Sequence, residues 1–291
     1  MKKIAIVSSQ KWAYKIKEDL FLKEQLSNYG IDAEIISWED TDIDYKKYDC
    51  LIIRSIWEYQ EKYNEFKAWL NMLKSSNIKI FNTIDIITNN ILKDRQFKIL
   101  DDNGIPHIPT KFKKTDLDIF ENNETFVVKP IISGSGSNTF LVVAQAEMTK
   151  NQINSSDTYA IYKNIIAEED NGIMIQPFVK NIENGEYACV FIDGENTHNM
   201  LRYPGIFSEK KSPKHLANIP IDVAELAKKV SNISEYSGYL YMRVDIIIYK
   251  DIPIIMEVEL CDPDLMIKYI EDDELRLHVI DKFAKTISKR L

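Results

Sequence analysis

The 291-residue sequence predicts an α/β protein in which an open parallel sheet comes first and a mixed α+β part follows. Two observations predict this fold class. Over about the first 85 residues, short apolar runs alternate with helical patterns, which is typical of a parallel sheet. Beyond them, paired apolar runs meet across the turn signals Asp193-Gly194 and Lys250-Asp251, which predicts antiparallel hairpins.

The N-terminal elements follow from these runs in chain order. They are strands at residues 3–8, 33–36, 50–53 and 79–81, and helices at residues 14–29 and 63–73. The first helix shows a loose pattern of Ile16, Leu20, Phe21 and Leu26, and it ends at Gly30. No GxGxxG run follows the first strand, so the sequence does not support a dinucleotide-binding site.

The second part opens near Thr88 with a helix predicted at residues 90–103, which Gly104 closes. Its later elements are strands at 125–129 and 139–143, hairpins at 187–192/199–203 and 239–249/254–260, and helices at 222–234 and 272–289. We expect three domains. Their bounds are residues 1–88 for an N-terminal α/β domain, 89–175 for a small lobe and 176–291 for a C-terminal lobe.

The composition excludes several classes of partner. Apolar residues make up 45% and charged residues 28%, as in ordinary soluble proteins, and no apolar stretch approaches the roughly 18 residues of a membrane span. The net charge of −8 argues against a nucleic-acid partner, because phosphate groups would be repelled overall. Cys50, Cys189 and Cys261 are far apart, which argues against a zinc site or disulfides and fits the cytoplasm. The sequence sets no oligomeric state, for which a homodimer is the commonest default.

The last hairpin is the most informative feature, because it carries three carboxylates on one predicted face. Side chains alternate along a strand, so Glu257 and Glu259 point the same way, and a turn near Asp251 places Asp245 opposite Glu257. Buried carboxylates this close repel by roughly 4 kcal/mol per pair, and hard oxygen ligands suit Mg²⁺ or Mn²⁺. The alternative is a solvated sheet face. Arg243 shares the face, either as a salt-bridge partner or as a catalytic group that holds a phosphate.

A glycine- and serine-rich segment follows the strand that ends at Lys129. Small residues let backbone N–H groups approach phosphate oxygens, and a lysine on an apolar strand needs an anion. The spacing is not that of a P-loop, and a strand follows rather than a helix. We therefore expect a loop that folds over phosphates, although a merely flexible hairpin loop is the alternative. Its members are Ser133, Gly134, Ser135, Gly136 and Ser137.

Two further groups are candidate substrate ligands. Arg54, Ser55 and Trp57 follow the 50–53 strand, at the strand end where open α/β sheets bind ligands. A packed aromatic with a surface arginine is the alternative. Arg202 is expected either to bind a substrate carboxylate or to brace its hairpin.

In their order and spacing these motifs resemble the ATP-grasp superfamily, over nearly the whole chain. The resemblance implies an ATP-grasp fold behind an N-terminal pre-ATP-grasp domain, with ATP and magnesium as cofactors. It makes Lys93 the helix lysine, Lys129 the strand lysine and Glu186 the acceptor for the ribose hydroxyls. The adenine hinge would be Gln176, Pro177, Phe178 and Val179, and the metal ligands would be Asp245, Glu257 and Glu259.

Within the superfamily the chain is similar to the cycloserine synthetase-like ATP-grasp proteins, and also to D-alanine ligase and glutathione synthetase-type enzymes. The similarity rests on the runs 54–59, 185–186 and 256–260. The subgroup's runs read RSxWDY and ExELxxPSL, so Glu58 and Asp264 are departures, and Glu259 stands where most ATP-grasp enzymes carry Asn.

The resemblance implies a carboxylate–amine ligase that works on a small, amino-acid-like molecule. ATP would activate the substrate carboxylate as an acyl phosphate, and an amine-like nucleophile would displace the phosphate. Two alternatives use the same residues: an ATP-dependent kinase of small molecules, and a non-catalytic nucleotide-binding regulator.

Overall fold

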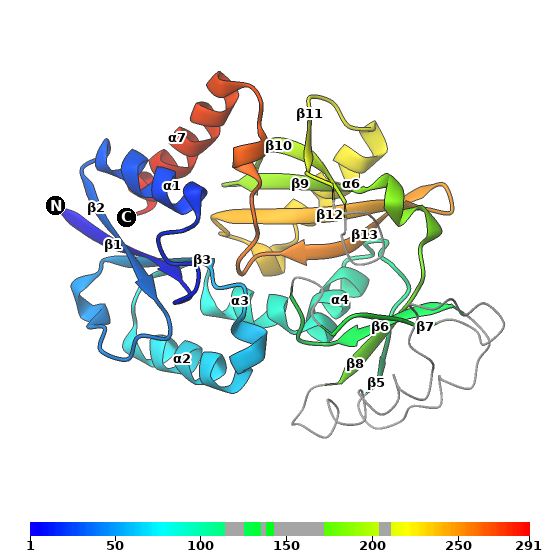
Figure 1. The fold of residues 1–291 in the computed structure, drawn as a ribbon, viewed down its shortest axis with the longest axis horizontal. Helices are drawn as coiled ribbons and strands as arrows, with labels where there is room; N and C mark the ends of the chain where they lie inside the picture. The colour runs from blue at the N-terminus through cyan, green and yellow to red at the C-terminus, as the bar shows by residue number, and fades with distance from the viewer. Residues whose placement is uncertain (114–124, 135–137, 143–171, 204–210) are drawn as a thin grey trace.

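The computed structural model describes residues 1–113, 125–134, 138–142, 172–203 and 211–291, and it arranges them around three β-sheets (Figure 1). The first sheet, within residues 2–81, lies at one end of the molecule beside both termini. The third sheet, within residues 186–259, lies in the middle, and the second sheet, within residues 111–177, lies at the far end. Short 3₁₀ turns connect the main elements at Tyr45–Lys47, Tyr59–Lys62, Lys180–Asn184, Ser234–Tyr236 and Ile267–Tyr269.

The first sheet is parallel, as predicted. Its order is β2-β1-β3-β4, and apolar β-branched residues fill its strands because both faces are covered. The strands are β1 (Lys2–Ser8), β2 (Ile31–Ser37), β3 (Cys50–Ser55) and β4 (Ile80–Phe81), and the helices are α1 (Lys17–Ser27) and α2 (Tyr63–Ser76).

The buried face of α1 differs from the pattern that predicted the helix. Leu20 is 36% exposed and Phe21 is 42% exposed, whereas Glu18 and Asp19 are buried. The two acids turn inward because Arg54 on β3 offers them a buried cation. An apolar pattern could not show this, since it treats charged side chains as surface groups.

The prediction of a single helix at 90–103 is wrong, because the helix is interrupted at Leu92. α3 (Ile84–Ile91) ends there, α4 (Lys93–Asp102) begins there, and Leu92 has extended backbone angles. The side chain of Asn90 accepts a hydrogen bond from the Leu260 amide and donates one to the Val258 carbonyl, which ties the break to a strand far along the chain. As a result Lys93 stands at the first turn of α4.

The second sheet has the order β5-β8-β6-β7 and is antiparallel. Its strands are β5 (Lys111–Lys113), β6 (Phe126–Pro130), β7 (Phe140–Val142) and β8 (Ile173–Pro177). Ser133 and Gly134 follow β6, and the other three residues of the predicted phosphate loop, 135–137, lie outside the described residues. The expected domain boundary at 176 falls inside β8, so we propose that the small lobe extends to the end of that strand.

The third sheet contains both predicted hairpins and has the order β11-β10-β9-β12-β13. Its strands are β9 (Glu186–Ile192), β10 (Glu195–Arg202), β11 (Lys214–Leu216), β12 (Tyr241–Tyr249) and β13 (Ile252–Glu259). Helix α6 (Ile221–Ser231) packs its apolar side on this sheet, through Leu226 and Val230 among others.

The last helix, α7 (Asp273–Arg290), returns to the start of the chain and packs beside α1 (Figure 1). Ile280, Phe283 and Ile287 share one core cluster with Ile4 and Ile6 of β1. The three cysteines are buried free thiols. Among the described residues, no helix combines the length and the apolar character needed to cross a membrane.

Candidate active site

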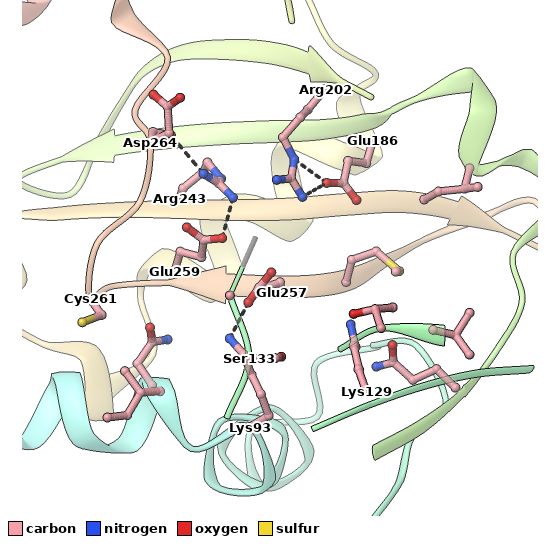
Figure 2. A pocket seen from close by; sticks show the side chains of 18 of the residues that line it. Lys93, Lys129, Ser133, Glu186, Arg202, Arg243, Glu257, Glu259, Cys261 and Asp264 are labelled. Atoms are coloured by element: carbon pink, nitrogen blue, oxygen red, sulfur yellow. Dashed lines mark hydrogen bonds and ion pairs between the residues drawn. The ribbon is translucent and has the colours of Figure 1, made fainter. Parts of the chain in front are cut away.

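A cavity of about 470 Å³ lies where the second sheet faces the β12–β13 hairpin (Figure 2). Most of the residues predicted from the sequence line it together. They are Trp57, Lys93, Lys129, Ser133, Gly134, Gln176, Pro177, Phe178, Val179, Glu186, Arg202, Arg243, Glu257 and Glu259. The structure therefore brings residues of the second and third sheets together with Lys93 of α4 and with Trp57, which follows β3.

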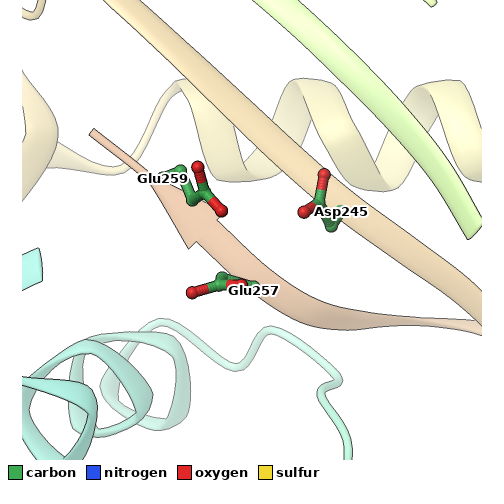
Figure 3. A group of neighbouring side chains, drawn as sticks. All are labelled: Asp245, Glu257 and Glu259. Atoms are coloured by element: carbon green, nitrogen blue, oxygen red, sulfur yellow. The ribbon is translucent and has the colours of Figure 1, made fainter. Parts of the chain in front are cut away.

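The three hairpin carboxylates lie on one face, in the register that the sequence predicted (Figure 3). Asp245 pairs with Glu257, and one ligand oxygen from each of Asp245, Glu257 and Glu259 lies within 4.8 Å of the others. Asp245 is fully buried and the two glutamates are partly buried, so the alternative of a solvated sheet face is wrong. Three convergent carboxylates form the donor set that a hard divalent cation prefers.

Cationic side chains of the chain itself hold these carboxylates. Arg243 donates from Nε and Nη2 to the two oxygens of Asp245, both at 2.9 Å, and Nη2 also donates to Glu259 at 2.6 Å. Of the two roles expected for Arg243, the structure shows the salt bridge. Lys93 pairs with Glu257 from the first turn of α4 (Figure 2).

The pKa values of the two glutamates are driven in opposite directions. Burial raises the pKa of Glu257, but the charges of Lys93 and Lys129 outweigh burial and lower it to about 2. Burial, with Glu257 and Asp245 close by, raises the pKa of Glu259 to about 8 despite Arg243. Burial and the neighbouring carboxylates therefore disfavour the ionised form of Glu259, and a divalent cation bound beside it would stabilise that form. The residues present fit such an ion.

Glu186 and Arg202 face each other across the β9–β10 ladder and form a second ion pair in the cavity wall. Arg202 Nε donates to Glu186 Oε1 at 2.6 Å, and Arg202 Nη2 lies 3.4 Å from Asp245. Gly185 precedes Glu186 with a φ of +93°, and a Cβ there would lie 3.0 Å from the Arg202 carbonyl oxygen. Glycine at this position lets the two strands approach closely enough for the pair to form.

Lys129 lies on β6 in the wall opposite the hairpin (Figure 2). Burial lowers its pKa, although Glu257 raises it. Within the part of the chain that the structure describes, its ammonium group makes no ion pair. A cation in this position suits an anionic ligand in the cavity.

The predicted hinge residues 176–179 are the last two residues of β8 and the two that follow it, and they line the same cavity. Gln176 is buried, and its amide nitrogen donates to the hydroxyl of Thr110 at 2.9 Å. Pro177, Phe178 and Val179 supply an apolar wall, which suits the flat face of an aromatic ligand.

Two predicted substrate ligands need correction, since Arg54 and Ser55 do not line the cavity. Arg54 is 4% exposed and lies 3.3 Å from Asp19, whose carboxylate also accepts from the Ser55 hydroxyl at 2.6 Å. Both side chains are therefore occupied inside the protein. Trp57 does line the cavity, and its indole N–H donates to the backbone oxygen of Asp262 at 2.9 Å.

The sequence reading missed several cavity residues. Among them are Asn90, Cys261, Asp262 and Asp264. A signal was present for the two aspartates, because they follow directly on the strand that carries Glu257 and Glu259. Asn90 had none, since its position depends on the break at Leu92.

Known families match this arrangement. Residues 4–82 match the N-terminal domain of D-cycloserine synthetase DcsG, and residues 105–270, more than half of the chain, match the ATP-grasp domain of prokaryotic glutathione synthetase. The chain belongs to the ATP-grasp family. The ATP-grasp fold and the enzyme class expected from the sequence, an ATP-grasp ligase, are confirmed by this membership.

Individual relatives agree with the ATP-grasp assignment. The cycloserine biosynthesis protein DcsG of Streptomyces lavendulae is 24% identical in an alignment of 295 positions, which covers 93% of this chain and 92% of that protein. The crystal structure of D-cycloserine synthetase DcsG matches with a TM-score of 0.82 and 20% identity over 99% of each chain. That of D-alanine–D-alanine ligase from Bacillus anthracis with ATP matches with a TM-score of 0.66 and 16% identity over 100% of this chain and 99% of that one.

Proposed function

We propose that this ATP-grasp protein is an ATP- and magnesium-dependent carboxylate–amine ligase that acts on a small, amino-acid-like substrate through an acyl phosphate. One observation carries the proposal: Glu257 and Glu259 line the same cavity as Lys93 and Lys129, and the carboxylate of the buried Asp245 lies beside theirs. Carboxylates that face lysines in one cavity suit a metal-bound polyphosphate, since the carboxylates can bind the metal ion and the lysines can bind the phosphate oxygens. The relatives named as ligases and synthetases support the ligase reading.

In this proposal each wall of the cavity holds one part of ATP. Residues 176–179 would bind the adenine, and Glu186 would accept from the ribose hydroxyls. Lys129 and Lys93 would bind phosphate oxygens, with Ser133 and Gly134 beside them. Asp245, Glu257 and Glu259 would hold magnesium, which offsets the charge that develops as a phosphoryl group moves.

The arginines have separate proposed tasks. Arg243 fixes Asp245 and Glu259 through three hydrogen bonds, so it would hold the ligand carboxylates in place and neutralise charge beside the transferring group. Arg202 holds Glu186 in the same way, and its partly exposed guanidinium would be available to a substrate carboxylate. Neither role needs a proton to leave an arginine.

A screen of ADP release tests the proposal. The protein is given ATP and magnesium with amino acids and small carboxylates, each with and without an added amine. We expect turnover to require a carboxylate and to give an amide-type product. Hydroxylamine added in place of the amine should trap an acyl phosphate as a hydroxamate.

Other outcomes would support the alternatives. Full turnover with an alcohol alone and formation of a phosphate ester would make the protein a kinase. Tight ATP binding without turnover across the whole panel would make it a nucleotide-binding regulator.

A further inference from the structure

The loop that follows β13 is held by an unbroken series of side-chain donors. The backbone oxygens of residues 262–264 accept, in chain order, from Trp57 Nε1 at 2.9 Å, Arg54 Nη1 at 3.3 Å and Arg243 Nη1 at 3.0 Å. Two of these donors come from the N-terminal domain and one comes from β12. The loop is therefore held from two sides at the edge of the cavity. Arg54 does not line the cavity, but it helps to position this loop through its hydrogen bond to the Pro263 carbonyl.

The two carboxylates of this loop differ in their partners. Asp264 Oδ1 accepts from the Met266 amide at 2.9 Å, and Oδ2 lies 3.2 Å from Lys268 Nζ. Asp262 also lines the cavity, but within the described residues it has no cation at ion-pairing distance.

The cationic side chains around Asp262 already form ion pairs with other acids. Lys93 pairs with Glu257, Arg54 with Asp19, and Arg243 with Asp245 and Glu259. Burial raises the pKa of Asp262 to about 7, although Lys93 and Arg54 lower it. A carboxylate in a cavity wall without its own cation is stabilised by a ligand that brings one.

On the basis of the proposed ligase function, we propose that Asp262 binds the ammonium group of the carboxylate substrate. The substrate class is then an amino acid, which carries both the carboxylate to be activated and an amino group for recognition. Trp57 and Tyr59 line the same cavity, and aromatic side chains tolerate cations well. Asp262 would be a specificity-determining residue.

The test compares amino acids with counterparts that lack only the amino group. The pairs are D- and L-alanine with propionate, and D- and L-serine with 3-hydroxypropionate, each measured by ADP release. In the wild-type protein we expect the amino acid that is used to exceed its counterpart in kcat/KM by roughly 10- to 100-fold. Asp262→Asn should remove this preference through a raised KM for the amino acid, with little change in kcat or in use of the counterpart.

Three controls separate recognition from folding. Asp262→Glu keeps the charge and should retain part of the preference. Glu271→Gln changes an exposed acid further along the same segment and should leave all values unchanged. Melting temperatures and ATP affinity should be the same in all variants. A preference that survives Asp262→Asn, or a wild-type protein that shows none, overturns the proposal.

Calorimetric titration of the same compounds with a non-hydrolysable ATP analogue and magnesium gives a second readout. Should no carboxylate drive ADP release, the ligase proposal fails, yet the titration still tests Asp262. Amino-acid binding that weakens in Asp262→Asn supports the assignment, whereas equal binding by the variant and the wild-type protein, or no binding at all, sinks it.

Discussion

Two buried clusters in this molecule combine acids with an arginine, and they serve different ends. On the β12–β13 hairpin, Arg243 holds Asp245 and Glu259 at the wall of a cavity. Between α1 and β3, Arg54 holds Asp19 and Glu18, and these three residues do not line the cavity. The chemistry is nearly the same in both.

The difference lies in what satisfies the spare oxygens. In the α1 cluster the Ser55 hydroxyl and the Lys268 amide complete the partners of the acids. In the hairpin cluster the two partly exposed glutamates line the cavity, and burial with the neighbouring carboxylates disfavours the ionised form of Glu259. A buried ion pair alone therefore does not indicate a site. An ion pair whose remaining lone pairs open into a cavity does.

The largest effect is expected at the hairpin. Glu257→Gln should lower ATP turnover by about 1000-fold, because it removes a proposed metal ligand and the partner of Lys93. ADP release measures the loss, and the ATP affinity should change little. Asp251→Asn, in the turn of the same hairpin, is the matched control and should keep full activity. Turnover within tenfold of the wild-type value in Glu257→Gln would contradict the proposed metal site.

Changes in the α1 cluster should mainly lower the stability of the protein. Arg54→Met leaves two acids buried without their cation, which should cost about 3–5 kcal/mol of unfolding free energy in urea. Lys74→Met breaks an exposed pair with Asp85 and should cost less than about 1 kcal/mol. Equal losses in the two variants would show that the buried cluster is not held by Arg54.

The pH dependence of stability sharpens the comparison further. Burial and the charge of Asp264 raise the pKa of Glu18 to about 7, so the folded state keeps a proton that the unfolded state has already released. Stability is therefore lost as the pH rises from the unfolded pKa through about 7. In Glu18→Gln the fall in unfolding free energy between about pH 5 and 8 should be smaller by roughly 2 kcal/mol. An unchanged pH slope would speak against a buried, titrating Glu18.

The smallest effect tests the face of α1. Phe21→Gln changes an exposed side chain and should alter the unfolding free energy by less than about 0.5 kcal/mol. Leu22→Ala removes a buried side chain and should cost at least about 2 kcal/mol. A larger loss of unfolding free energy in Phe21→Gln than in Leu22→Ala would show that α1 buries the face predicted from the apolar pattern.

The features that the sequence predicted well are those set by near neighbours. Alternation along β12 and β13 and a turn near Asp251 were enough to place Asp245 opposite Glu257. The order of apolar runs was enough for the parallel sheet and both hairpins. These patterns are local, so one sequence contains them.

The features that were missed depend on partners far along the chain. Glu18 and Asp19 are buried because Arg54 lies against them, and the helix breaks at Leu92 because Asn90 binds β13. Asp262 can be recognised as a candidate ligand only after the neighbouring cations are seen to form ion pairs with other acids. No periodicity records such pairings, which exist only in the folded chain.

The return of α7 to the N-terminal sheet has a consequence for synthesis. β1 and α1 are made well before Ile280, Phe283 and Ile287 of α7, which belong to the same core cluster as β1. The N-terminal sheet therefore cannot complete its core until α7 has been made. Until then its apolar surface is open to chaperones.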